Sequence, residues 1–291
     1  MATPAEWVAG ARPRTLPAAA SPVLVGSGAA ALAGGFSAGR ALLALGVALA
    51  LQVGVNYAND YSDGVRGTDL DRVGPLRLTA SGLARPGHVK AAAFAAFGVA
   101  AVLGLLLTWL SGQWWLLAVG AAAIVAAWYY TGGKRPYGYA GLGEVGVFVF
   151  FGLVATLGTT FTQAGRVTGP SVLGAVGVGL IACALLMVNN LRDIPTDVVA
   201  GKRTLAVRLG DARARQAYVT MLGVPLLLGA LAGIWSPWAL GVLLLSLPAV
   251  LLSLPVLAGA RGKLLVPVLA GTGMYELAYG VLLAVGLALG A

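Results

Sequence analysis

Charge, cysteine and histidine are all scarce in this sequence. Only 10% of its 291 residues are charged, whereas ordinary soluble domains carry about 25%, so an ordinary soluble fold is excluded. The single cysteine, Cys183, and the single histidine, His88, exclude a disulfide framework and a zinc site built on clusters of these residues.

Apolar residues are abundant instead, and they come in long runs. Hydrophobic residues make up 59% of the chain, and a membrane-spanning helix needs roughly 20 consecutive apolar residues. The first run follows Arg12 and Arg14, has spanning length and lacks a cleavage context, so we read it as a span and not as a signal peptide. The sequence predicts an all-α polytopic membrane protein, one domain over residues 1–291, with nine spans at about 16–35, 41–58, 91–110, 114–130, 145–163, 171–190, 217–235, 238–258 and 267–289.

The basic residues predict the orientation of these spans. With the N-terminus inside the cell, all Lys and Arg residues except Arg40 and Arg166 fall in cytoplasmic segments, as the positive-inside rule requires. We therefore expect a multi-pass protein of the bacterial cell membrane, with a cytoplasmic N-terminus and an external C-terminus. The net charge of +9 is then a matter of topology, and it does not indicate a nucleic-acid partner.

The acidic residues gather on the same predicted side. Only Glu276 lies within a span, whereas ion carriers tend to place ionisable groups near the middle of the membrane. This distribution favours a site that faces a charged substrate in the cytoplasm, and it argues against a divalent-cation or organic-anion transporter.

Two carboxylate clusters stand at equivalent cytoplasmic ends of two spans. After the second span, Asn56, Asn59, Asp60 and Asp63 would share one face of a helix. After the sixth span, Asn189, Asp193 and Asp197 are spaced i, i+4 and i+8 and would again share one face, although Pro195 stands between the last two. The pattern Asn-x-x-x-Asp therefore occurs twice.

The chemistry of these clusters points to a hard metal ion. Grouped carboxylates repel one another without a counter-charge, and carboxylate and amide oxygens suit Mg²⁺, which commonly bridges one or two carboxylates to substrate phosphates. Because Arg and Lys flank both clusters, we interpret them as a Mg²⁺–diphosphate site. The alternative is a solvated loop with surface ion pairs.

A third segment, residues 129–144, joins the fourth and fifth spans on the same side. Its Lys134 and Arg135 are suited to phosphate oxygens. Its tyrosines, among them Tyr139, would either line an aromatic pocket or anchor the chain at the membrane interface.

With these motifs the sequence resembles the UbiA superfamily of intramembrane aromatic prenyltransferases. The resemblance covers nearly the whole chain, and it includes both Asp-rich motifs and the Tyr-Thr-Gly-Gly segment at residues 130–133. Residues 56–69 and 189–197, together with 11–16 and 72–77, are most similar to the MenA branch, the 1,4-dihydroxy-2-naphthoate polyprenyltransferases.

The resemblance implies a nine-helix bundle with a cytoplasm-facing active site. By motif, its metal ligands, which would hold two Mg²⁺ ions on the substrate diphosphate, are Asn59, Asp60, Asp63, Asp69, Asn189, Asp193 and Asp197. We expect catalysis to depend on Asp63, Asp193, Lys134 and Tyr139. We expect substrate binding by Asn56, Arg66, Arg77, Lys134, Arg135, Tyr139, Arg192 and Lys202.

The implied reaction joins a polyprenyl diphosphate to 1,4-dihydroxy-2-naphthoate within the lipid bilayer, with loss of CO₂ and diphosphate, to give demethylmenaquinone. No covalent enzyme intermediate is needed, which agrees with the lack of a Ser/His/Asp or Cys/His constellation. The main alternative is a sister prenyltransferase that uses 4-hydroxybenzoate, homogentisate or a porphyrin. The sequence does not predict prenyl chain length or oligomeric state.

Overall fold

The computed structural model describes residues 2–67 and 76–291, and the secondary structure of these residues is entirely helical. The α-helices are α1 (Pro4–Gly10), α2 (Leu16–Leu32), α3 (Ala38–Arg66), α4 (Pro86–Ser111), α5 (Leu116–Tyr129), α6 (Gly143–Val147), α7 (Ala155–Ala164), α8 (Gly169–Val199), α9 (Leu205–Leu231), α10 (Ser246–Leu257) and α11 (Val266–Ala288). Between α6 and α7 lies a π-helical segment, η3 (Phe148–Val154), and short 3₁₀ turns include η2 (Tyr137–Ala140) and η5 (Pro237–Leu245).

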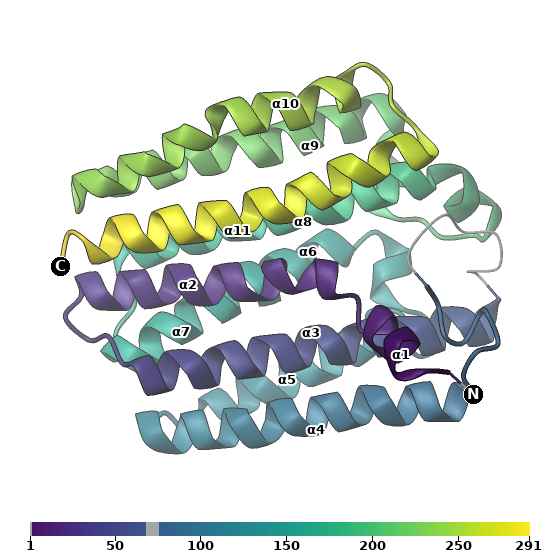
Figure 1. The fold of residues 1–291 in the computed structure, drawn as a ribbon, viewed down its shortest axis with the longest axis horizontal. Coiled ribbons are helices and arrows are strands. Elements are labelled where there is room, and N and C mark those ends of the chain that lie inside the picture. Colours follow the sequence, from purple (N-terminus) through teal and green to yellow (C-terminus); the bar gives the residue numbers. More distant parts are fainter. Residues whose placement is uncertain (1, 68–75) are drawn as a thin grey trace.

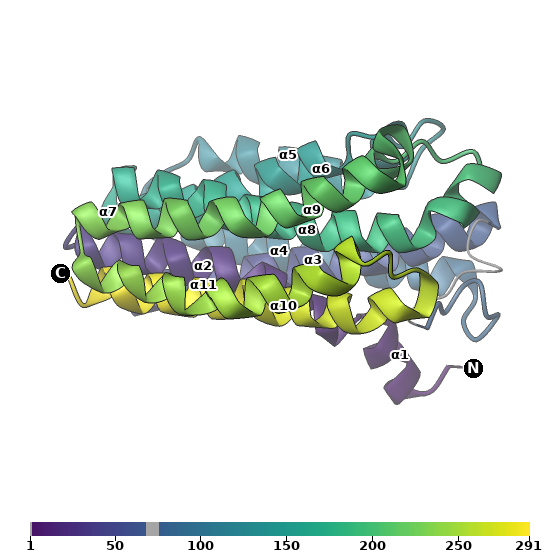
Figure 2. The same cartoon turned by 90° about the horizontal axis from the view of Figure 1, so that it is seen from above.

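The long helices run side by side along the longest axis of the molecule (Figure 1). Helix α8 packs against α9, α11, α2 and η3, while α9 and α10 flank the bundle on one side and α4 on the other. The two ends of the chain lie at opposite ends of the bundle in both views (Figures 1 and 2).

Glycine allows some of these helices to approach closely. A Cβ atom added at Gly28 of α2 would lie 2.5 Å from the Cα atom of Ala284 in α11. At Gly152 of η3 it would lie 2.6 Å from the Cα atom of Gly179 in α8. Small residues at such crossings are typical of membrane bundles, where close packing replaces the hydrophobic effect as the source of attraction.

The predicted all-α membrane fold is confirmed. Among the described residues, eight helical stretches are long and apolar enough to cross a membrane. The ninth predicted span, 114–130, corresponds to α5, which has 14 residues and a length of about 21 Å. It is short because Trp114 and Trp115 form a turn before Leu116, where the helix begins.

Two helices extend well past the apolar runs that predicted them. Helix α3 continues to Arg66 and ends where Gly67 adopts a left-handed conformation with φ of 73°. Helix α8 continues through Pro195 to Val199, so the proline does not interrupt it. Residues 56–63 and 189–197 are therefore helical, and each of these two stretches is held on a long helix.

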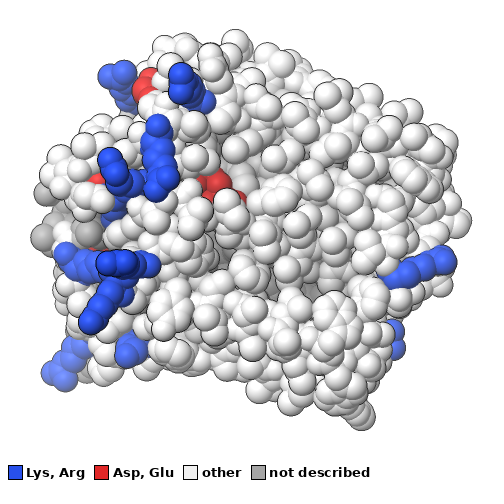
Figure 3. Space-filling view, turned by 180° about the vertical axis from the view of Figure 1, so that it is seen from behind, with Lys and Arg blue, Asp and Glu red and all other residues white. Residues whose placement is uncertain are grey.

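Most charged side chains lie at one end of the bundle, which we call the charged end. It contains the end of α3, the end of α8 and the segments 76–85, 130–142 and 200–204. In the space-filling view, Lys and Arg gather at this end around a hollow that contains acidic side chains (Figure 3). The far end carries Arg40 and Arg166, which bind the carbonyl groups of Leu110 and Ala33.

Helix α9 contains one position whose backbone conformation requires glycine. Gly210 has φ of 75° and ψ of 165°, a region that only glycine occupies without strain. We expect Gly210→Ala to destabilise the protein by about 1–3 kcal/mol, which lowers the melting temperature by about 2–4 °C for each kcal/mol. Thermal unfolding of the detergent-solubilised protein measures the change.

The matched control for this prediction is Gly223→Ala in the same helix. Gly223 is exposed and has no atom within 4 Å of an added Cβ, so alanine should not lower the melting temperature. An equal decrease for both variants would contradict the backbone explanation.

Candidate functional site

A cavity of about 1300 Å³ lies inside the bundle. Its walls come from α2, α3, α4, α5, η3, α7 and α8, and most of its lining is apolar. The polar part of the lining is concentrated at the charged end. We call the part of the cavity that lies at the charged end its mouth. The rest of the cavity is a long apolar interior.

The α3 motif contributes Asn59 and Asp63 to the cavity wall. The side-chain carbonyl of Asn59 accepts a hydrogen bond from the Thr131 hydroxyl at 2.8 Å. Asp63 is buried, accepts a hydrogen bond from the Tyr139 hydroxyl, and lies 3.7 Å from the Arg77 guanidinium. Side chains from segments 76–85 and 130–142 therefore hold both Asn59 and Asp63 in place.

The α8 motif contributes Asn189, Arg192 and Asp197 to the same wall. Arg192 binds Asp193 through two hydrogen bonds of 2.6 and 2.7 Å, and it donates a third, of 2.9 Å, to the side-chain carbonyl of Asn189. Asp193 is buried and is not part of the cavity lining. Its position behind Arg192 fixes that guanidinium, because a two-pronged pair has a single geometry.

Tyr139 connects the elements of the mouth. It lies on η2, lines the cavity and donates to Asp63. Its ring lies 4.6 Å from the Lys202 ammonium and 5.4 Å from the Arg66 guanidinium. Its backbone carbonyl accepts a hydrogen bond of 2.9 Å from the amide of Arg203. These contacts tie segment 130–142 to segment 200–204.

Lys202 is a buried cation of this mouth, as are Arg77 and Arg192. Its side chain lines the cavity and only 7% of the residue is exposed. Its amide donates a hydrogen bond of 2.8 Å to the carbonyl of Asp197. A buried ammonium in the wall of a cavity is suited to a multiply charged anion.

Several predicted site residues lie elsewhere. Lys134 and Arg135 are exposed and are not part of the cavity lining. Arg66 is also outside the lining, and its guanidinium donates to the carbonyls of Thr131 and Gly133. Arg66 therefore supports segment 130–142 and does not face the cavity.

Asp60 and Asp69 differ from the other predicted ligands. Asp60 is fully buried outside the cavity lining, and its two oxygens accept hydrogen bonds from the amides of Leu78 and Thr79, at 2.7 and 2.9 Å. It anchors the segment that carries Arg77. Asp69 lies outside the described residues.

Asn56 takes part in a group of hydrogen bonds that the sequence did not indicate. Its amide donates to the Thr15 hydroxyl and to the carbonyl of Ala11, each at 2.9 Å. Gln52 donates to both Thr15 and Asn56. The segment that precedes α2 is thereby fixed to α3, and Arg12 from this segment lines the cavity. The signal in the sequence for this segment was the resemblance of residues 11–16 to the MenA branch.

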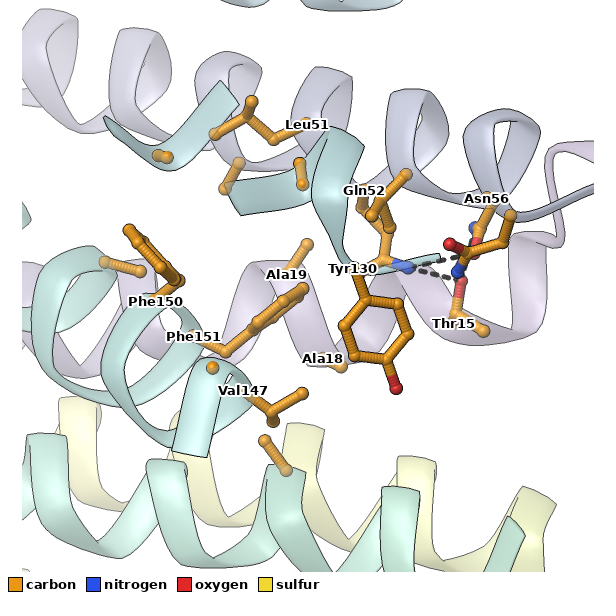
Figure 4. A pocket seen from close by; sticks show the side chains of 18 of the residues that line it. Thr15, Ala18, Ala19, Leu51, Gln52, Asn56, Tyr130, Val147, Phe150 and Phe151 are labelled. Carbon is orange, nitrogen blue, oxygen red and sulfur yellow. Dashed lines mark hydrogen bonds between the residues drawn. The ribbon is translucent and has the colours of Figure 1, made fainter. Parts of the chain in front are cut away.

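Aromatic side chains line the cavity next to this group. Figure 4 shows the rings of Tyr130 and Phe151 in the space beside Thr15, Gln52 and Asn56. Phe151 belongs to the π-helical segment, a type of segment that is frequent at functional sites. Tyr137 packs edge-on against Tyr130, and burial raises the pKa of Tyr137 to about 12.

The donor set at the mouth fits a hard metal ion that is shared with a substrate. No three His, Cys, Asp or Glu side chains of residues 2–67 and 76–291 form a metal-binding group by themselves. However, Asn59, Asp63, Asn189 and Asp197 place amide and carboxylate oxygens around one space. Mg²⁺ typically takes one or two carboxylates, several waters and substrate phosphates, and this set meets that requirement.

Comparison with known proteins gives consistent results. The UbiA prenyltransferase family matches residues 19–263. The chain is 52% identical over 290 residues to a 1,4-dihydroxy-2-naphthoate octaprenyltransferase of Mycobacterium tuberculosis, covering 100% of this chain and 99% of that protein. It is 40% identical over 236 residues to the enzyme of the same name from Escherichia coli, covering 79% and 77%.

Solved structures share the fold. A UbiA homolog from Archaeoglobus fulgidus, bound to GPP and Mg²⁺, aligns with a TM-score of 0.66 and 14% identity, covering 96% of this chain and 99% of the other. At this identity the likeness concerns the arrangement of the helices.

Proposed function

Because this chain belongs to the UbiA prenyltransferase family, we propose that it transfers a polyprenyl group from an allylic diphosphate to 1,4-dihydroxy-2-naphthoate. CO₂ and diphosphate are released, and the product is demethylmenaquinol, the reduced form of demethylmenaquinone, which is an intermediate of menaquinone biosynthesis. The names of the bacterial relatives support this acceptor. The membrane-spanning helices support a location in the cell membrane. We also propose that residues 1–291 form a single catalytic domain.

The observation that carries this proposal is the composition of the cavity. The candidate metal ligands and three buried cations line its mouth together with other polar side chains, and the rest of the wall is largely apolar. A diphosphate with a long hydrocarbon tail has the same division of polarity. The oxygen donors are Asn59, Asp63, Asn189 and Asp197, and the cations are Arg77, Arg192 and Lys202.

We assign the chemistry to these residues as follows. Asn59, Asp63, Asn189 and Asp197 would hold the divalent metal, for which we propose two Mg²⁺ ions per site. When bound, these ions would neutralise charge on the departing diphosphate. Arg77, Arg192 and Lys202 bind the diphosphate oxygens while the allylic C–O bond breaks and its electron pair leaves with the diphosphate. Tyr139 holds Asp63 in position by its hydrogen bond. Asp193 holds Arg192.

The apolar wall has a separate task. It excludes water from the allylic carbocation, which would otherwise be hydrolysed. The electron-rich ring of the acceptor attacks instead, and loss of its carboxylate as CO₂ restores its aromatic character. The rings of Tyr130 and Phe151 at the inner side of the mouth are suited to contact the flat acceptor.

An assay with two acceptors tests the proposal. The purified protein receives one polyprenyl diphosphate with either 1,4-dihydroxy-2-naphthoate or 4-hydroxybenzoate, while prenylated product, CO₂ and diphosphate are measured. We expect equal amounts of the three from the naphthoate. Product from 4-hydroxybenzoate alone would assign the chain to a sister activity.

Removal of divalent ions should abolish turnover. The carboxylates of Asp63 and Asp197 need a cation between them and the diphosphate, because the charges otherwise repel. Excess EDTA should reduce product formation to background, and Mg²⁺ in excess of the chelator should restore it. Full activity in EDTA would overturn the assignment of these oxygens.

We propose that the charged end faces the cytoplasm. The distribution of Lys and Arg supports this orientation. Arg85→Cys and Arg213→Cys, at two exposed positions of the charged end, should react with impermeant maleimide only after spheroplasts are opened. The native Cys183 is buried and adds little background.

The control for orientation is Arg166→Cys at the far end, where the residue is exposed. It should be labelled in intact spheroplasts. The reverse labelling pattern would place the candidate active site on the outer side of the membrane.

A further inference from the structure

Glu144 is a buried acid beside the cavity, and the chemistry assigned above does not use it. It lies on α6, just after segment 130–142, and only 5% of the residue is exposed. Its Oε1 atom accepts a hydrogen bond of 3.1 Å from the side-chain amide of Asn190. Its Oε2 atom is buried and receives no hydrogen bond from the described residues. A buried carboxyl group with a single partner costs free energy, so stability alone does not favour glutamate at this position.

The backbone around Glu144 is fixed against α8. The Cys183 thiol donates a hydrogen bond of 3.2 Å to the backbone carbonyl of Glu144. At the preceding residue, Gly143, an added Cβ atom would lie 3.3 Å from both the Leu186 side chain and the Tyr130 hydroxyl. The carboxyl group of Glu144 therefore has a defined position next to α8, from which it orients a side chain of that helix.

Asn190 is the side chain that Glu144 orients, and it faces the cavity. It lines the cavity wall one helical turn after Leu186 and directly after the candidate metal ligand Asn189. An asparagine amide has two N–H donors and one carbonyl acceptor. Because Glu144 accepts one N–H, the orientation of the amide is fixed. The carbonyl oxygen of Asn190 accepts no hydrogen bond from the part of the chain that the structure describes, so it can accept one from a ligand.

An aromatic part and a polar part of the cavity wall meet at Asn190. Tyr130 and Leu186 line the wall next to it, and Asn189 belongs to the candidate metal site. The ring of Tyr130 projects into the cavity (Figure 4). A flat molecule against this ring would lie beside the diphosphate with one edge at Asn190. A phenolic hydroxyl on that edge can donate to the amide oxygen, whereas an ionised prenyl diphosphate has no hydrogen-bond donor.

We propose that Asn190 recognises a phenolic hydroxyl of the acceptor and that Glu144 is the positioning residue that aims the Asn190 carbonyl at it. This inference rests on the proposed prenyl transfer. It adds the group by which the cavity recognises its aromatic substrate, a ring hydroxyl that donates to an amide oxygen. Without Glu144, the amide can turn over and present its N–H groups in place of the oxygen, and the hydroxyl then loses its acceptor.

Replacement of Glu144 tests the positioning. In Glu144→Leu the partner of the Asn190 amide is lost, and the KM for 1,4-dihydroxy-2-naphthoate should rise by a factor on the order of ten, the scale of one hydrogen bond. The KM for the prenyl donor should not change, because the donor makes no hydrogen bond to this carbonyl. Glu144→Gln keeps a carbonyl oxygen and should restore the KM for the acceptor.

Analogues that lack one hydroxyl test the contact itself. The two compounds are 1-hydroxy-2-naphthoate and 4-hydroxy-2-naphthoate, each measured as a competitive inhibitor against the acceptor. Asn190→Ala should weaken the analogue that keeps the recognised hydroxyl by a factor on the order of ten. It should not change the inhibition constant of the other analogue, because the two losses concern the same hydrogen bond and do not add.

The matched control is Glu276→Leu. Glu276 is a fully buried acid of α11 that lies outside the cavity lining, and its two side-chain oxygens receive no hydrogen bond from the described residues. Its replacement also removes a buried carboxyl group, but both KM values should stay those of the unaltered protein. The melting temperature of each variant shows whether the fold is intact.

The outcomes separate this inference from the proposed function. An unchanged KM for the acceptor in the folded Glu144→Leu variant, or equal increases for donor and acceptor, would overturn the positioning role. Equal weakening of both analogues in Asn190→Ala, or of neither, would overturn the contact with the hydroxyl. Each of these results leaves prenyl transfer intact. If the unaltered protein transfers no prenyl group, the proposed function itself fails.

Discussion

Asp63→Asn should lower turnover by a factor on the order of 10² or more, the scale seen when a key electrostatic stabiliser is removed. Asp63 lines the cavity, is buried, and contacts both Tyr139 and Arg77. Asparagine keeps the shape of the side chain and removes its charge, so the loss reports on charge at the metal and diphosphate site. Initial rates at saturating donor, acceptor and Mg²⁺ measure it.

The matched control for Asp63 is Asp211→Asn. Asp211 lies at the same end of the bundle and forms an ion pair of 2.7 Å with Arg215, but it is outside the cavity lining. Its replacement should leave turnover close to that of the unaltered enzyme. If both variants lost activity equally, the defect would concern the charged end as a whole and not the cavity mouth.

Lys202→Ala should reduce kcat/KM for the prenyl donor by a factor on the order of 10², because a buried charged partner of the diphosphate contributes about 2–3 kcal/mol. Lys134→Ala should have little effect, since Lys134 is exposed and outside the cavity lining, whereas Lys202 is buried within it. Steady-state kinetics of the two variants measure the contrast.

The Lys202→Ala and Lys134→Ala variants test whether the structure or the sequence motif identifies the lysine that binds the diphosphate. The motif alone suggested Lys134 as a catalytic residue, and the geometry favours Lys202 for the contact with the diphosphate. Lys202→Arg should recover part of the activity by restoring the charge. A large loss in Lys134→Ala with a normal Lys202→Ala would reverse the assignment.

The sequence predicted the membrane fold well because a helix that is buried in lipid must consist of mostly apolar residues. Each span needs a long apolar run. The run at 171–190 lies within α8, and the run at 267–289 matches α11, which ends one residue earlier at Ala288. Features that depend on local hydrogen bonding were not visible in the same way. The late start of α5 after Trp115 and the π-helical segment at 148–154 both lie in continuously apolar sequence.

The sequence predicted the site less completely than the fold. Spacing on a helix correctly brought Asn59 and Asp63 to one face, and the structure places both in the cavity. Spacing could not show that Asp60, one residue from Asn59, turns to the amides of a later segment. It also could not rank Lys134 against Lys202, because burial of a loop lysine depends on contacts between segments that are distant in the chain.

The contacts of Asp60 determine how the effects of substitutions at Asp60 and at Arg77 combine. It binds the amides of Leu78 and Thr79, and the residue just before them, Arg77, lies beside Asp63. Loss of Asp60 therefore removes much of what Arg77 provides, and a second change at Arg77 has less left to remove. The two positions form a thermodynamically coupled pair whose effects do not add. A lineage that replaced Asp60 would have to stabilise the segment around Arg77 by another contact.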